Sequence, residues 1–410
     1  MEDNLIKRIV QKIFCVGKDV YMDIQADFRL LKWGKTHCTE KIRVGFLVQM
    51  AEIWDKQVPV YEELLTRDNV EVFLFVVPPF DFEKKEITNS YEKNYFLDKY
   101  VAAVNAIDEQ GEIINLKSYG LDYIFYQRPY DQYLPEQLRS YNVSNYCKCC
   151  YIPYGFSGAV AFDGGNTSRA FFRNMYFTFK DSSYMQKKLM KKYPISSKLK
   201  IRHIENLGYP SLEPYLCAAD SSDMVKTVLW TPRWSYDPIL GGSHFVEYKS
   251  VPFALLEKYK DLQCIFRPHP LMFDELRAKQ LMSEGEIAEY LFALENSNIA
   301  YDVGTPIDEA IAKSDVLITD FSSIIIMFFL TGKPIIYCKS QIEFNDIFQK
   351  MSKYMYIAES EADIYRYIDQ LANGNDYLRE TREKFIQEEF IHHINSSKRI
   401  VDRIISDGIK

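Results

Sequence analysis

The stretch SDVLITDFSS, residues 314–323, is the most informative segment of this 410-residue chain. Its apolar residues 316–319 predict a short buried strand, and Asp320 stands where that strand ends. Ser322 and Ser323 then open an apolar stretch that predicts a buried helix. Because the first turn of a helix has unpaired N–H groups and a partial positive charge, a phosphate can bind there, with the serine hydroxyls as further donors. A serine N-cap on a buried helix is the structural alternative.

Short apolar segments alternate with helical patterns on both sides of this stretch, in two series. The predicted strands of the first series are 41–48, 70–77, 122–127, 146–152, 172–180 and 203–207. Those of the second series are 227–230, 263–266, 299–303, 316–319 and 334–337. This alternation indicates parallel βαβ units, and two series predict two doubly wound, Rossmann-like α/β domains facing a central cleft. Glycosyltransferases of the GT-B type are built in this way, as are several kinases and dehydrogenases, and ligands bind at the carboxyl ends of the strands.

Length and composition divide the chain into three predicted parts. A chain of 410 residues exceeds one ordinary core, so we expect two domains. Ala, Asp and Ser cluster near residues 215–223, which places the boundary there. We therefore predict an N-terminal helical segment at 1–40, a first Rossmann-like domain at 41–215 and a second one, with a helical tail, at 216–410.

The N-terminal segment carries an amphipathic helical pattern. Its apolar residues are Leu5, Ile6, Ile9, Val10, Ile13 and Phe14, and its basic residues are Lys7, Arg8, Lys12 and Lys18. Two interpretations stay open. The helix packs on the body of the protein and leaves a solvated basic face, or it rests on the anionic cytoplasmic face of the cell membrane. No segment approaches the ~18–20 apolar residues of a membrane span.

Composition and missing motifs exclude several classes of protein. A net charge of −7 without a long basic tract argues against a general nucleic-acid binder. No signal peptide precedes the eight cysteines, so we expect a reducing, cytoplasmic compartment. Cys147 and Cys150 lack the second ligand pair of a zinc site and predict a buried strand instead. The chain has neither a G-x-x-x-x-G-K-[ST] loop nor a G-x-G-x-x-G or G-x-S-x-G motif, and no Asp-x-Asp pair, so we expect neither a metal nor a cofactor.

Two further segments carry chemistry in the second half. FRPHP at 266–270 ends a predicted strand, with Arg267 as a fixed cation and His269 on a backbone stiffened by two prolines. WTPRW at 230–234 ends another strand, and the loop GGSH at 241–244 follows it. Arg233 and a flexible Gly-Gly loop suit a diphosphate. A surface turn with the arginine stacked on tryptophan is the structural alternative.

The order TPRW, RPHP and SDVLITDFSS resembles the C-terminal half of the CDP-glycerol glycerophosphotransferase family of teichoic-acid and capsule synthesis. In that family the corresponding His-Pro and Ser-Asp…Thr-Asp-x-Ser-Ser segments bind the diphosphate of the activated donor. The resemblance includes NLGYPS at 206–211 and continues more loosely through Trp54 and QRPYD at 127–131. It implies a donor-binding second domain and an acceptor-binding first domain. The implied donor diphosphate ligands are Arg233, Arg267, His269, Asp320, Ser322 and Ser323.

One departure from the family concerns the general base. Members of the polymerase type carry a His-Gly-Thr-Pro segment in the first domain, and its histidine is the favoured base. The comparable segment here is YIPYG at 151–155, which resembles a smaller subgroup with Y-x-P-Y-G. The candidate catalytic residues are therefore His269, His244 and Tyr154, and Asp131 and Asp163 also stay open as bases.

The resemblance implies transfer of a polyol phosphate from CDP-glycerol or CDP-ribitol to a hydroxyl of a cell-surface glycan or teichoic-acid-like acceptor. The acceptor attacks the β-phosphorus and CMP leaves, so positioning and charge stabilisation supply most of the acceleration. A GT-B glycosyltransferase that uses a nucleotide sugar is one alternative. A catalytically inactive, nucleotide-binding scaffold subunit is another.

Overall fold

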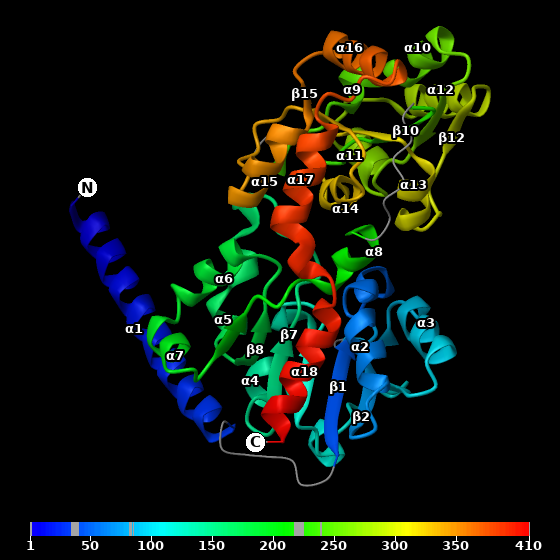
Figure 1. Ribbon diagram of the computed structural model, residues 1–410. Helices are drawn as coiled ribbons and strands as arrows, with labels where there is room; N and C mark the ends of the chain where they lie inside the picture. Colours follow the sequence, from blue (N-terminus) through cyan, green and yellow to red (C-terminus); the bar gives the residue numbers. More distant parts are fainter. Residues whose placement is uncertain are drawn as a thin grey trace. The chain divides into compact units, whose positions relative to one another are not determined.

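The structure is a computed structural model that describes residues 2–33, 41–81, 84, 86–216, 225–237 and 240–409, with residues 2–16 described by their backbone alone. The chain forms two compact units, and each is described by itself (Figure 1). Unit 1 comprises Met1–Ser157, Asp163–Ser211 and His392–Lys410, and unit 2 comprises Gly158–Phe162 and Leu212–Ile391.

Unit 1 is built on a seven-stranded sheet in the order β5-β2-β1-β6-β7-β8-β9, in which every neighbouring pair is parallel. Its strands are β1 (Ile42–Val48), β2 (Val70–Val76), β5 (Ala103–Asn105), β6 (Tyr123–Tyr126), β7 (Lys148–Tyr151), β8 (Met175–Phe179) and β9 (His203–Glu205). A short antiparallel pair, β3 (Phe80–Asp81) and β4 (Glu86–Ile87), stands apart from it. The central strands are buried on both faces, as parallel sheets covered by helices are. Cys147 and Cys150 are free and buried in and beside β7, as the sequence predicts.

The helices of unit 1 are α1 (Glu2–Trp33), α2 (Val58–Leu65), α3 (Tyr91–Lys99), α4 (Ser140–Val143), α5 (Arg169–Phe172), α6 (Ser183–Met190), α7 (Pro194–Lys198) and α18 (Ser396–Gly408). Unit 2 has helices α8 (Glu213–Leu216), α9 (Phe245–Tyr248), α10 (Val251–Lys258), α11 (Met272–Ala278), α12 (Glu284–Glu295), α13 (Ile307–Lys313), α14 (Ile324–Leu330), α15 (Asp346–Met351), α16 (Glu361–Ala372) and α17 (Arg379–Phe390).

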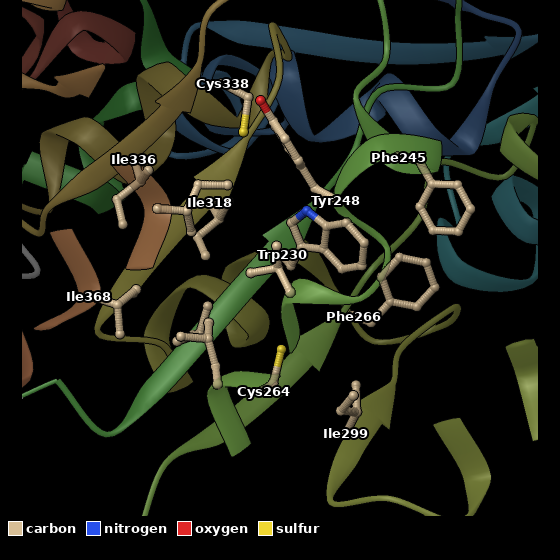
Figure 2. Packing of buried hydrophobic residues seen from close by; sticks show 14 of the residues in the cluster. Trp230, Phe245, Tyr248, Cys264, Phe266, Ile299, Ile318, Ile336, Cys338 and Ile368 are labelled. Atoms are coloured by element: carbon tan, nitrogen blue, oxygen red, sulfur yellow. The ribbon is translucent and has the colours of Figure 1, made fainter. Parts of the chain in front are cut away.

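The sheet of unit 2 has six parallel strands in the order β12-β11-β10-β13-β14-β15. They are β10 (Thr227–Thr231), β11 (Gln263–Phe266), β12 (Ile299–Tyr301), β13 (Val316–Thr319), β14 (Ile335–Cys338) and β15 (Tyr356–Ala358). Aromatic side chains pack together against this sheet in the hydrophobic core of unit 2. The Trp230 ring lies 5.0 Å from that of Phe266, and Phe245 of α9 lies 5.8 Å from Phe266 (Figure 2).

Each sheet reverses its strand order at one point. In unit 1 the chain moves from β1 outward through β2 and β5, then returns to β6 on the other side of β1. In unit 2 it moves from β10 outward through β11 and β12, then returns to β13 on the other side of β10. In doubly wound folds, ligands bind outside the carboxyl ends of the two strands that flank such a switch point. The two pairs are β1/β6 and β10/β13.

Two segments belong to a different unit from the one that the sequence predicts. Residues 158–162 belong to unit 2, because Val160 N–H donates to the Glu343 carbonyl (2.9 Å) and the Phe162 ring stacks on that of Phe321 (6.1 Å). The predicted second domain at 216–410 loses its last 19 residues, since unit 1 takes His392–Lys410, and it begins at Leu212. Helical periodicity shows that a segment has an apolar face but not which sheet that face covers, so the sequence could not place α18.

The predicted N-terminal helix is present as α1 (Glu2–Trp33), and residues 34–40 of the predicted segment lie outside the described residues. The side chains of residues 5–14, on which the amphipathic pattern rests, lie outside the described residues. Beyond them, Asp19 pairs with Arg173 (2.5 Å) and Asp27 with Arg202 (2.7 Å), so this half of α1 packs on unit 1. An opposite set of apolar side chains is exposed: Val20, Tyr21, Ile24, Phe28 and Leu31. Contact with a membrane stays a prediction.

Within the described ranges, no helix is both long and apolar enough to cross a bilayer.

A buried charge network attaches α18 to the sheet of unit 1. The Asp407 carboxylate accepts hydrogen bonds from the Lys148 ammonium (2.8 Å), the Tyr123 hydroxyl (2.7 Å) and the Tyr176 hydroxyl (3.1 Å). We expect Asp407→Asn to destabilise the docking of α18 by about 3 kcal/mol, because it removes the negative charge from a buried ion pair with Lys148. Hydrogen exchange of the α18 amides measures this.

Asp402→Asn on the same helix is the control. Asp402 pairs with Arg67 at 2.9 Å, but its side chain is 51% exposed. An exposed pair contributes less than about 1 kcal/mol, so the control should change exchange little. Equal effects of the two variants would contradict the role assigned to Asp407.

Candidate functional site

The carboxyl ends of β10 and β13 are joined by two threonines. The Thr319 hydroxyl donates to the Thr231 carbonyl (2.9 Å), and the Thr231 hydroxyl donates to that of Thr319 (2.8 Å). Both side chains are buried. The residues that follow the two strands, among them Arg233 and Asp320, therefore leave the sheet side by side at the switch point of unit 2.

The Asp320 carboxylate is buried and bonded within its own chain. One oxygen accepts the backbone N–H of Arg233 (2.9 Å) and of His244 (3.3 Å), and the other lies 2.5 Å from Nδ1 of His244. The sequence predicts Asp320 as a diphosphate ligand, and in this geometry both of its carboxylate oxygens are already bonded within the chain. A carboxylate whose oxygens are occupied repels a phosphate, so Asp320 instead positions the loops of Arg233 and His244.

His244 is oriented by this carboxylate at the start of α9. A carboxylate only accepts hydrogen bonds, so Nδ1 of His244 carries the proton that faces Asp320. The ring stacks on Tyr248 one turn later, at 5.4 Å and an interplanar angle of 8°. Burial alone lowers the pKa of His244, but the hydrogen bond and charge of Asp320, with Glu247, raise it above its ordinary value. Nε2 is left to face a reactant, which is the arrangement of a general base held by a carboxylate.

Arg233 lies half-buried beside this pair. Its guanidinium donates to the Phe321 carbonyl (2.7 Å) and sits 5.6 Å from the centre of the Phe321 ring. Among the described residues it forms no ion pair, and burial lowers its pKa while the charge of Asp320 opposes this. Gly241 packs against it with φ +115°, and a Cβ there would come within 3.1 Å of the arginine side chain. The sequence alternative of an arginine stacked on tryptophan is therefore wrong, since the ring is phenylalanine.

His269 approaches the same arginine from the end of β11. Its ring lies 5.8 Å from that of Trp234, and its Nδ1 accepts the Leu271 N–H at 3.1 Å. Desolvation and the positive charge of Arg233 lower its pKa, so the ring is neutral and its proton is on Nε2. This tautomer donates a hydrogen bond but does not accept a proton at Nε2. The geometry thus favours His269 as a phosphate ligand over its predicted role as a base.

Arg267, the other cation of this segment, is committed elsewhere. Its Nη1 donates to the Asp302 carboxylate and to the Thr305 carbonyl, both at 2.6 Å. These bonds fasten the loop after β12 to the end of β11. The predicted contact of Arg267 with a diphosphate has no support in this geometry, because the side chain is already neutralised by a carboxylate.

The two serines lie at the start of α14. Ser322 is half-buried, and its hydroxyl oxygen accepts the Ile324 N–H over a long 3.4 Å. Ser323, at the N-cap position, is exposed and makes no side-chain capping bond. A capping role therefore accounts for only one long hydrogen bond of Ser322 and for none of Ser323. Both hydroxyls remain candidates to donate hydrogen bonds to a phosphate.

The remaining candidates lie in unit 1 or are held by structural bonds. The Tyr154 hydroxyl pairs with that of Tyr130 (2.8 Å), and burial raises its pKa further above 10, so it is a poor base. Asp131 accepts the Ser140 N–H (2.8 Å) and hydroxyl (2.6 Å). Asp163 binds Lys188 and the Tyr184 hydroxyl. Both oxygens of Asp131 are therefore bonded, whereas the partners of Asp163 share one of its oxygens, Oδ2.

The described residues include no cluster of three or more His, Cys, Asp or Glu side chains arranged to hold a metal ion. Reasoning from the sequence missed the link between Asp320 and His244, because 76 residues separate them. The spacing of His244 and Tyr248, one helical turn apart, is the one local signal that pointed to an oriented ring.

Fold and site together define a GT-B-like enzyme, with two doubly wound units and a cluster of Arg233, His244 and Asp320 at the switch point of the second. The family model described as CDP-Glycerol:Poly(glycerophosphate) glycerophosphotransferase matches residues 178–406, more than half of the chain. The chain therefore belongs to this family of transferases. The family, fold class and enzyme class predicted from the sequence are confirmed, while the Y-x-P-Y-G subgroup stays a prediction.

Solved structures share the fold at low sequence identity. A UDP-GlcNAc 2-epimerase from Neisseria meningitidis, bound to UDP-GlcNAc, is 12% identical with a TM-score of 0.59, covering 89% of this chain and all of its own. The wall teichoic acid polymerase TagF, soaked with CDPG, is 13% identical with a TM-score of 0.53, covering 97% of this chain and 98% of its own. No curated protein matches the chain in sequence.

The pairing of Asp320 with His244 makes a prediction for titration. Asp320→Asn removes the charge that raises the pKa of His244 and leaves its burial, so this pKa should fall. NMR titration of the imidazole resonances measures it. Glu247→Gln removes a negative charge that raises the pKa of His244 less than Asp320 does, so this variant should lower the His244 pKa by a smaller amount. An unchanged His244 pKa in Asp320→Asn would rule out the pairing.

Proposed function

We propose that the protein transfers glycerol phosphate, or the related ribitol phosphate, from its CDP-activated form to a hydroxyl of a polyol-phosphate or cell-surface glycan acceptor, releasing CMP. The observation that carries this proposal is the Asp320–His244 pair beside Arg233, which forms no ion pair with any described residue, at the switch point of unit 2. It supplies a base and a cation at one place, within a chain of the matching family.

The donor diphosphate is held by groups that donate hydrogen bonds or carry positive charge. Arg233 offers a guanidinium whose planar fork matches phosphate oxygens. His269 offers Nε2–H, and the start of α14 offers the hydroxyls of Ser322 and Ser323. These groups keep their positions as the reaction proceeds, so negative charge that develops on the phosphates meets preorganised donors.

The chemical step needs one proton acceptor. The acceptor hydroxyl attacks the β-phosphorus, its oxygen forms the new P–O bond, and the bond from that phosphorus to the bridging oxygen breaks. CMP leaves with the electron pair as a phosphate, which needs no protonation at neutral pH. The hydroxyl proton passes to Nε2 of His244, and the Asp320 carboxylate stabilises the imidazolium that forms.

A donor-binding experiment tests the substrate class. Arg233→Gln should weaken CDP-glycerol binding about 10–100-fold, because a charge-assisted hydrogen bond to phosphate is lost. Calorimetry in EDTA measures it, with CDP-ribitol, UDP-sugars and GDP-sugars in parallel. Arg277→Gln is the control, since Arg277 pairs with Glu284 on the surface of unit 2.

Two outcomes would contradict the proposal. Binding of a nucleotide sugar in place of any CDP-polyol would leave a GT-B glycosyltransferase. Binding of CDP-glycerol without any transfer, over a panel of polyol-phosphate and glycan acceptors, would leave an inactive nucleotide-binding subunit.

The pH dependence separates two roles of His244. As a base it acts in its neutral form, so kcat/KM should rise with pH through the raised pKa of His244 and then level off. Asp320→Asn should move this rise to lower pH and reduce the plateau, and His244→Gln should abolish it. If His244 served only as a cation for the diphosphate, kcat/KM would instead fall as the pH rises through the same pKa.

A further inference from the structure

Unit 1 has a switch point of its own, to which the proposed donor site assigns no role. It lies at the carboxyl ends of β1 and β6, which are parallel neighbours from Val44↔Tyr123 to Leu47↔Tyr126. Gln49 follows the first strand and Arg128 follows the second. Doubly wound sheets bind ligands at this position, so these side chains stand where a ligand is expected.

A buried amide fixes the backbone on both sides of this switch point. Gln127 is 1% exposed, and its side-chain oxygen accepts the N–H groups of Gln49 (2.7 Å) and Met50 (2.8 Å). Its side-chain nitrogen donates to the Met50 carbonyl at 2.7 Å. Because every polar atom of this amide is bonded, the loop after β1 and the residue before Arg128 are held together rigidly.

Arg128 itself is half-buried and poorly satisfied. Its Nε donates to the Gln49 side-chain oxygen over 3.4 Å, and its Nη1 meets the Met50 sulfur at 3.3 Å, so both contacts are weak. In the part of the chain that the structure describes, no carboxylate forms an ion pair with it. The negative charge of Glu92 raises the pKa of Arg128, but Glu92 forms no ion pair with this arginine. Its carboxylate instead accepts the Ala51 N–H at 2.5 Å.

A desolvated cation without a counter-ion is costly unless a ligand supplies the charge. Burial lowers the pKa of Arg128, which is the sign of this cost. Arginines elsewhere in the structure are typically neutralised, as Arg43 is by Glu71 and Arg267 by Asp302. Arg233, at the switch point of unit 2, likewise forms no ion pair among the described residues, although the nearby charge of Asp320 acts on it.

Tyrosines complete the surroundings of the guanidinium. Arg128 lies 4.9 Å from the ring centre of Tyr133, which is 60% exposed. Tyr130 and Tyr154 lie close enough to raise the pKa of Arg128 through their charges, and their hydroxyls share a 2.8 Å hydrogen bond. Only one of these two hydroxyls uses its proton in that bond, so the other can donate to a ligand. A fixed arginine fork flanked by phenol hydroxyls suits a phosphate that carries a hydroxylated chain.

We propose that these residues, Gln49, Arg128, Tyr130, Tyr133 and Tyr154, form the Arg128 site, which binds a phosphate group of the acceptor. The ligand class is a polyol phosphate, as a monoester or as a diester of the acceptor. The identification of that ligand as the acceptor rests on the proposed transferase function, whereas the anion site rests on the geometry alone. The enzyme then favours acceptors that already carry polyol phosphate over neutral glycans.

Direct binding tests the site without turnover. Calorimetry with glycerol 3-phosphate should show binding to the wild-type protein, and glycerol should show none. Arg128→Gln should weaken glycerol 3-phosphate binding by at least about 30-fold, because a charged hydrogen-bond partner of the phosphate is lost. Arg128→Lys should weaken it less, since the charge remains and the planar fork is lost.

The matched control removes the same charge from the opposite edge of the sheet. Arg43 lies at the amino end of β1, where it is exposed and pairs with Glu71 at 3.0 Å. Arg43→Gln should leave glycerol 3-phosphate binding unchanged. Thermal unfolding of all variants, together with an unchanged affinity for CDP-glycerol, shows that each remains folded.

Turnover adds the link to the acceptor. In Arg128→Gln the KM for a glycerol-phosphate-terminated acceptor should rise about 30-fold, while the KM for CDP-glycerol stays the same. An unchanged acceptor KM and glycerol 3-phosphate affinity would overturn the Arg128 site and leave the proposed transfer intact. Loss of CDP-glycerol binding would overturn it as well, because Arg128 would then serve the donor. Glycerol 3-phosphate binding that depends on Arg128, in a protein that binds no CDP-polyol, would overturn the proposed function and keep the anion site.

Discussion

The buried carboxylate of Asp320 is the constraint on which the candidate site depends. It stands directly after β13, accepts backbone N–H groups from the loops that carry Arg233 and His244, and holds the imidazole at Nδ1. A buried carboxylate is stable only when it is bonded in this way, so the site and the local fold stabilise each other. One side chain thereby sets both the path of the loop that carries the cation Arg233 and the tautomer of the histidine.

The two units place polar chemistry according to the same physical rule. Parallel strands covered on both faces by helices leave their carboxyl edge as the place where side chains can meet a ligand. Arg233 and Arg128 stand at this edge, one in each unit, and both lack a carboxylate partner among the described residues. Most of the other charged side chains discussed here, such as Arg267 and Asp407, are neutralised within the protein and maintain its architecture.

The departure from the His-Gly-Thr-Pro pattern of the family has a consistent chemical meaning in this structure. Tyr154 stands in the segment where other members carry histidine, and its raised pKa makes it unsuited to take a proton. His244 of unit 2, with a carboxylate behind it, has the geometry of a base, while His269 presents a proton to a ligand. The same segment brings Tyr154 beside Tyr130 in the Arg128 site, where a hydroxyl is useful and a base is not required.

The sequence by itself determined the fold class, the family and the segments that surround the proposed donor site. Buried parallel strands appear in the sequence as short apolar runs, and the polar residues that follow them lie in SDVLITDFSS, FRPHP and WTPRW. The local sequence pattern was therefore sufficient to predict these strands and the segments at their ends. The sequence did not predict the edge strands β5 and β15, although β9 and β12, equally short strands at the opposite edges of the two sheets, were predicted. Tertiary structure alone decided that α18 joins unit 1, that Asp320 binds His244 and that Arg267 is neutralised by Asp302. These outcomes depend on which partners the folded chain brings within hydrogen-bonding distance, and that is a property of long-range contacts rather than of local sequence.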